Sequence, residues 1–224
     1  FYYLQDYYCL KNKMIVNIEK SKTMICNESG KILKNISFKI GNHNLEMVQN
    51  FCYLGLDITS SGSLHIAKMN LKDKAIKAMF PLVDTVIKFR MNIKQSVDLF
   101  KQLISPILLY GSEITSSFTQ HQLKVISADP KLLGSYMINT QTEKVHLKFL
   151  KIIMGLKRNS PTLAILGETG QFPISLIGYL NLLKYWHRVS TLDENCLAKK
   201  ALHEINMLPD CKSEWKASTR ILLK

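Results

Sequence analysis

Residues that break or cross-link a chain are scarce in this sequence. Ten of its 224 residues are Gly and 6 are Pro, which excludes collagen-like and low-complexity proteins. Its five cysteines, Cys9, Cys26, Cys52, Cys196 and Cys211, lie far apart. An odd number of dispersed cysteines argues against a disulfide framework and against a zinc ribbon. This cysteine usage does not suggest secretion, so we expect an intracellular protein.

Long apolar runs and familiar catalytic motifs are also missing. The longest apolar stretch, roughly 174–183, is interrupted by polar residues and falls short of a membrane span of about 20 residues. The sequence has no His-Glu-x-x-His, no phosphate-binding glycine loop and no Gly-x-Ser-x-Gly. Two-metal nucleotidyl transfer needs converging carboxylates, which the adjacent pair Asp193-Glu194 does not supply. We therefore expect no membrane association, no metal site and no cofactor in this chain.

Positive charge is what the sequence has in excess. Lys and Arg number 30 against 17 Asp and Glu, a formal net charge of +13. Such an excess favours a polyanionic partner, most simply nucleic acid; the alternative is a basic protein without such a partner. The charge is uneven, since residues 1–67 hold 7 basic and 5 acidic side chains whereas residues 68–224 hold 23 and 12.

The hydrophobic pattern changes near residue 64. Before it, alternating apolar residues predict two or three strands within 14–58, with candidates at 14–18, 22–26, 32–40 and 46–58. Turn signals separate them at Asn27–Gly30, at Gly41 and at Gly55. Residues 1–12 have a helical pattern.

After residue 64 apolar residues recur every three or four positions, which predicts helices. The predicted helices lie near 76–87, 97–108, 145–153, 162–166, 174–185, 197–207 and 214–223. We expect Pro81 and Pro106 to kink or split the first two of them, and 127–141 to be a loop. The fold class is therefore α+β: a small antiparallel β-hairpin unit over 1–64, followed by a mostly α-helical domain over 65–224.

Several segments, in order along the chain, resemble the reverse transcriptases of non-LTR (LINE-type) retrotransposons. Residues 14–24, MIVNIEKSKTM, resemble the stretch after the active-site loop, and residues 51–58, FCYLGLDI, resemble the next motif, F-x-Y-L-G. Residues 103–113, LISPILLYGSE, are similar to the thumb segment, and 148–155 and 165–170 to later segments. The resemblance extends over residues 4–190. It implies the end of the palm, a primer-grip hairpin and a thumb-like helical domain.

The sequence also departs from that family. The aromatic-x-Asp-Asp loop belongs upstream of Tyr2 and is absent, Ser21 replaces a Thr, and Thr115 stands where the family usually has Trp. Because the sequence begins with Phe1, we interpret it as a truncated reverse-transcriptase-like fragment of a retrotransposon polyprotein. Such a fragment is expected to be inactive alone, and Mg²⁺ is expected only for the full-length enzyme.

The resemblance assigns roles to residues of the first 64 positions. Lys20 matches the lysine proposed to protonate the leaving pyrophosphate, although a solvated lysine at a strand end is the alternative. Phe51, Tyr53, Leu54 and Gly55 match the primer grip. There a glycine lets the backbone approach a nucleic-acid strand, and an aromatic ring can pack on a sugar or a base. The alternative is a hairpin core with Phe51 and Tyr53 turned inward.

A candidate nucleic-acid site follows from the helix predicted over 145–153. Lys144, Lys148 and Lys151 recur at four and three residues and so share one helical face, and Lys157 and Arg158 come directly after. This cationic face is expected to contact the phosphates of an RNA or an RNA–DNA duplex. The alternative is an ordinary solvated face, and with it a helical protein-interaction module that has no nucleic-acid role.

Overall fold

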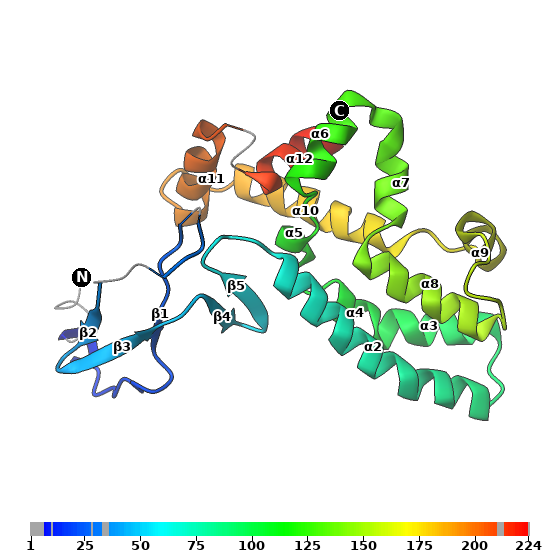
Figure 1. Cartoon of the computed structure of the whole chain (residues 1–224), viewed down its shortest axis with the longest axis horizontal. Helices are drawn as coiled ribbons and strands as arrows, with labels where there is room; N and C mark the ends of the chain where they lie inside the picture. The colour runs from blue at the N-terminus through cyan, green and yellow to red at the C-terminus, as the bar shows by residue number, and fades with distance from the viewer. Residues whose placement is uncertain (1–6, 10, 28, 33–35, 210–212, 224) are drawn as a thin grey trace. The chain divides into compact units, whose positions relative to one another are not determined.

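The computed structural model describes residues 7–9, 11–27, 29–32, 36–209 and 213–223 (Figure 1). The chain is an α+β protein that divides into two compact units, residues 1–67 and 68–224. Of the helix predicted over 1–12, residues 7–9 and Lys11 are helical, and residues 1–6 and 10 lie outside the described residues. In the described part of the chain, no helix combines the length and the apolar composition needed to cross a membrane.

The first unit contains two small sheets. Strands β1 (Lys22–Thr23), β2 (Phe38–Ile40) and β3 (His43–Met47) form one sheet in the order β1-β3-β2. Strands β4 (Asn50–Tyr53) and β5 (Leu56–Thr59) form the other. The pairs β2–β3 and β4–β5 are antiparallel hairpins with turns at Gly41 and Gly55, as predicted. The parallel pairing of β1 with β3 was not predicted.

The strand predicted at 14–18 is wrong. Residues 14–17 are irregular, a turn follows over 18–20, and Ile15 is 98% exposed. Asn17 explains the difference, because its side-chain oxygen accepts the backbone N–H of Lys20 at 3.1 Å and its carbonyl accepts that of Ser21 at 3.0 Å. An asparagine that satisfies the backbone locally favours a turn over a strand ladder.

The turn predicted at Asn27–Gly30 is confirmed, and it is attached to the end of β5. The backbone N–H of Asn27 donates to the carbonyl of Ser60 at 2.9 Å, and the Ser60 hydroxyl donates to the carbonyl of Gly30 at 2.6 Å. Gly30 has φ +64°, and a Cβ there would lie 3.0 Å from the Cβ of Ser61. Glycine therefore serves both the turn and the close approach of the two segments.

Helix α2 (His65–Lys88) runs through Pro81, so of the predicted kink or split the split is wrong. A proline removes the hydrogen bond to the carbonyl four residues earlier, which belongs to Lys77. Both Pro81 and Lys77 lie on the exposed side of α2, where water can serve that carbonyl. Pro106, by contrast, separates α3 (Ile93–Leu103) from α4 (Ser105–Leu108) and occupies the first turn of α4, where its missing N–H costs little.

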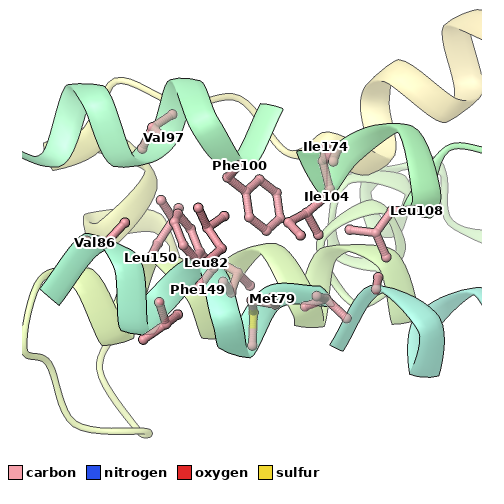
Figure 2. Close-up of a cluster of buried hydrophobic side chains, with 14 of the residues drawn as sticks. Met79, Leu82, Val86, Val97, Phe100, Ile104, Leu108, Phe149, Leu150 and Ile174 are labelled. Atoms are coloured by element: carbon pink, nitrogen blue, oxygen red, sulfur yellow. The ribbon is translucent and has the colours of Figure 1, made fainter. Parts of the chain in front are cut away.

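The main core of the second unit lies among α2, α3, α8 (Gln141–Ile153), α9 (Thr162–Thr169) and α10 (Ile174–Ser190). Figure 2 shows Met79, Phe100 and Phe149 in one cluster of buried side chains to which three of these helices contribute. The rings of Phe100 and Phe149 stack with their centroids 4.6 Å apart, and both side chains are buried. This stacking fixes α8 against α3 and turns the opposite side of α8 to solvent.

A second cluster joins α6 (Gln120–Ala128), α7 (Leu133–Ile138), α10 and α12 (Glu214–Leu222). The prediction of a loop over 127–141 is wrong, since the 3-10 helix η1 (Pro130–Leu132) and α7 occupy most of it. Leu133, Tyr136 and Met137 pack against this cluster, so tertiary burial makes a helix of a segment with weak local signals.

Helix α12 is held to the rest of the second unit by polar contacts. The backbone N–H of Phe118 donates to the Ser218 hydroxyl at 2.8 Å, and the Trp215 indole N–H donates to the carbonyl of Glu113 in α5 (Ser112–Thr115) at 2.8 Å. The buried Lys216 ammonium donates to the carbonyls of Asn206 and Leu208 at the end of α11 (Leu197–Met207). A lysine at a helix C-terminus satisfies carbonyls that the helix leaves unpaired.

We expect Gly178→Ala to lower the free energy of unfolding by about 1–3 kcal/mol, the usual cost of overpacking. Gly178 lies where α10 passes α5, and a Cβ there would approach the Ser116 hydroxyl oxygen to 2.4 Å. Urea denaturation of the purified chain measures the effect. Gly167→Ala in α9 is the matched control, because no atom lies within 4 Å of its Cβ position. Equal effects of the two substitutions would contradict the close approach.

Candidate nucleic-acid interface

Helix α8 presents two chemically different sides. Its N-cap Thr140 accepts the backbone N–H of Glu143 through its hydroxyl at 3.1 Å. Val145 and Phe149 are buried in the main core, whereas Lys144 and Lys148 are exposed. The structure thus places Lys144 and Lys148 on one solvent-facing side of a helix whose other side is anchored.

An aromatic residue of α2 belongs to the same surface. The Lys148 ammonium lies 4.9 Å from the ring centroid of Phe80, which is 47% exposed. Phe80 falls within the apolar pattern that predicts a helix over 76–87, yet it lies outside the buried side of α2. Ala75, Met79 and Val86 form the buried side of α2, and Phe80 stands one position beyond it. The spacing of about four residues along the buried side is the sequence signal that separates Phe80 from the core residues.

Lys151 does not share the free surface of the other two lysines. It is half-buried, and its ammonium donates to the carbonyl of Arg158 at 2.6 Å. The helix ends at Ile153 and reverses at Gly155, which has φ +66°. Lys151 therefore fixes the loop that follows α8, and this loop carries the exposed Lys157 and Arg158.

The primer-grip-like residues lie on the β4–β5 hairpin of the first unit. Phe51 and Tyr53 share one face of it and are 36% and 57% exposed, so neither is sealed in a hairpin core. Leu54 and Gly55 form the two-residue turn with φ +48° and φ +83°, the positive values that tight hairpin turns require. An exposed apolar hairpin tip results, with Leu54 73% exposed.

Lys20 is exposed and lies in the turn before β1. Its backbone N–H is bound by the Asn17 side chain at 3.1 Å. This position suits a solvated lysine as well as one that reaches a phosphate. Across the described residues, no group of three or more His, Cys, Asp or Glu side chains is arranged to hold a metal ion.

A buried polar pair within α8 links this helix to α10. Sequence analysis did not identify it. Glu143 is fully buried, and its Oε1 lies 3.0 Å from Nδ1 of the buried His146. Its Oε2 accepts the backbone N–H of Ser175 at 3.2 Å, in the first turn of α10. A carboxylate near a helix N-terminus interacts favourably with the helix dipole. Sequence spacing shows that Glu143 and His146 are neighbours on a helix, but not that α10 begins against them.

A second, partly buried charge lies at the start of α2. The Lys68 ammonium donates to the carbonyl of Ser117 at 2.9 Å. Burial lowers the pKa of Lys68 from its ordinary value of 10.5, an effect that the Glu214 carboxylate of α12 partly opposes. Lys68 thus connects α2 to the segment that α12 also binds.

Comparison of the chain with protein-family models, with curated proteins and with solved structures gave no match.

Replacement of Glu143 by Ala is expected to lower the free energy of unfolding by about 2–5 kcal/mol. The substitution leaves a buried imidazole nitrogen and the Ser175 N–H without an acceptor, at about 1–3 kcal/mol each. Urea denaturation at neutral pH measures the loss. Glu168→Ala, at an exposed glutamate of α9, is the matched control and should change stability by less than about 0.5 kcal/mol. A loss no larger than that of the control would show that Glu143 holds nothing together.

The stability of the wild-type chain relative to Lys68→Met should rise with pH as the pH approaches 10.5 from below. Because burial lowers the pKa of Lys68, the unfolded chain binds more protons than the folded chain between the folded pKa and 10.5. The penalty for burying the charge is complete below that window and disappears as the ammonium loses its proton. Urea denaturation across the pH range tests this, and a flat difference would contradict it. Lys74→Met, at an exposed position of α2, should show no such trend.

Proposed function

We propose that the second unit binds the phosphates of an RNA or an RNA–DNA duplex through the α8–α2 surface, defined by Lys144, Lys148 and Phe80. The observation that carries the proposal is the position of the Lys148 ammonium, 4.9 Å from the centroid of an exposed aromatic ring. The strong positive charge of residues 68–224, with 23 basic and 12 acidic side chains, supports the same partner.

The packing under this surface favours binding. Lys144 and Lys148 project from a helix whose opposite side is fixed by Phe149 and by the Glu143 carboxylate. The Phe80 ring holds the Lys148 ammonium near one position, which lowers the entropy lost when a phosphate binds. The exposed part of the ring can pack on a sugar or an unpaired base. Contacts of this kind depend on phosphate spacing and not on base identity.

The resemblance to LINE-type reverse transcriptases gives this binding a place within a larger activity. In that proposal the second unit is thumb-like, and the exposed Phe51 and Tyr53 of the β4–β5 hairpin contact a primer strand. The chain would then be a reverse-transcriptase-like segment that holds nucleic acid. Nucleotidyl transfer is not assigned to it, because the sequence lacks the carboxylates of the family's catalytic loop.

The double variant Lys144→Ala, Lys148→Ala should bind an RNA–DNA duplex more weakly and with a shallower dependence on salt. Each lysine that contacts a phosphate releases a counterion, so the log–log salt slope should fall by roughly one unit per lysine removed. Fluorescence anisotropy over a salt series measures both quantities. The matched control is Lys124→Ala, Lys200→Ala, which removes two exposed lysines from α6 and α11.

Two further variants separate the contributions within the same experiment. Phe80→Ala should weaken binding while leaving the salt slope unchanged, because the ring carries no charge. Lys151→Ala should change the slope less than Lys148→Ala, since its ammonium is bound to the carbonyl of Arg158. If the double variant and its control bind equally well at every salt concentration, the α8–α2 surface is a solvated face. The chain is then better explained as a helical protein-interaction module.

A further inference from the structure

An open depression of about 430 Å³ lies between α5 and α10, away from the residues of the α8–α2 surface. Its lining combines charged, aromatic, amide and aliphatic groups: Glu113, Ile114, Asn181, Lys184, Tyr185 and Arg188. Four of these residues belong to α10 and recur at spacings of three and four, so they form one continuous side of that helix.

The walls of the depression are fixed by contacts behind them. The Asn181 amide donates to the Ser112 hydroxyl at 2.9 Å, which joins α10 to α5. The Tyr185 ring meets the Trp215 ring edge-on, with centroids 6.2 Å apart. Trp215 in turn donates its indole N–H to the carbonyl of Glu113 at 2.8 Å. Three helices, α5, α10 and α12, therefore hold the lining side chains in place.

The charged groups of the depression are not used to hold the protein together. Among the ion pairs of the described residues, none includes Glu113, Lys184 or Arg188. Arg188 lies over the Tyr185 ring, with its guanidinium carbon 5.3 Å from the ring centroid. This stacking orients the guanidinium but leaves its N–H donors available. Lys184, Arg188 and Glu113 thus line the same depression, and no ion pair joins the carboxylate to either cation.

We propose that this depression binds a ribonucleotide. Arg188 and Lys184 bind its phosphate, because a planar guanidinium and an ammonium supply charge-assisted donors to phosphate oxygens. Glu113 accepts hydrogen bonds from the ribose hydroxyls, the role that an acidic residue takes beside a nucleotide phosphate site. The base rests against Ile114 and Tyr185, the apolar and aromatic residues of the lining. A carboxylate that repels phosphate but attracts hydroxyls favours this orientation over its reverse.

A free ribonucleotide and the 5′-phosphorylated end of an RNA strand present the same chemistry to these residues. The proposal is separate from duplex binding, since no residue of the depression belongs to the α8–α2 surface. A 2′-hydroxyl is the group that distinguishes ribose from deoxyribose at such a site. Discrimination by the sugar is therefore the property to measure.

Titration calorimetry of the full chain with AMP, with 2′-deoxy-AMP and with inorganic phosphate tests the site. We expect AMP to bind most tightly and inorganic phosphate most weakly. Lys184→Ala and Arg188→Ala should each weaken AMP binding by about tenfold, the effect of losing one charged hydrogen bond. Glu113→Ala should abolish the difference between AMP and 2′-deoxy-AMP. Lys200→Ala, at an exposed lysine of α11, is the matched control and should bind AMP normally.

A parallel titration with an oligoribonucleotide bearing a 5′-phosphate or a 5′-hydroxyl distinguishes the two sources. Tighter binding of the 5′-phosphorylated strand than of the 5′-hydroxyl strand identifies an RNA end, because the α8–α2 surface contacts both strands alike. Equal binding of the two strands together with binding of AMP identifies a free nucleotide. The proposal is overturned if AMP shows no heat of binding at millimolar concentration. It is equally overturned if its affinity is the same in wild type, Lys184→Ala and Arg188→Ala. Circular dichroism of each variant shows that the fold is retained, and duplex binding by α8 is unaffected by either result.

Discussion

The carboxylate of Glu143 joins the two helices on which both proposed binding surfaces depend. One oxygen lies beside His146 of its own helix, and the other accepts the Ser175 N–H in the first turn of α10. Helix α8 carries the lysines of the α8–α2 surface, and α10 carries four residues of the depression. Burying a carboxylate is costly unless its oxygens are hydrogen-bonded. Because these partners belong to α8 and α10, the hydrogen bonds that stabilise the buried carboxylate also fix how the two helices pack.

The helices of residues 65–224 could be predicted because their signals are local. Apolar spacing located α8 and α10, and the predicted helix at 197–207 coincides with α11. The errors arise where distant contacts decide. Packing of the partly buried Tyr136 against the second cluster favours a helix at α7, and the exposed side of α2 tolerates Pro81. In the first unit, hydrogen bonding by Asn17 replaces a strand that the apolar residues around it favoured.

In the candidate surfaces too, some features follow from local sequence spacing and others depend on tertiary packing. The charged side of α8 follows from sequence spacing alone, because a helix with a buried stripe must expose the rest. Lys151 illustrates the limit, since its bond to the carbonyl of Arg158 depends on the path of the loop after the helix. The proximity of Phe80 to Lys148 joins residues 68 positions apart, and the depression needs α5, α10 and α12 together. Local pattern specifies which side of a helix is free, whereas tertiary packing specifies what stands next to it.

The attachment of α12 also determines which parts of the second unit can fold before synthesis reaches α12. Its bonds reach back 100 residues, from Ser218 to Phe118, and 102 residues, from Trp215 to Glu113. A ribosome exposes α5, α6 and most of α10 well before it releases α12, so the aromatic pair Phe118 and Tyr179 emerges without its cover. Partly made chains with uncovered apolar surface are prone to aggregation. The main core, which uses residues up to Ile174, can form before α12 is translated and so hold the start of α10 in place.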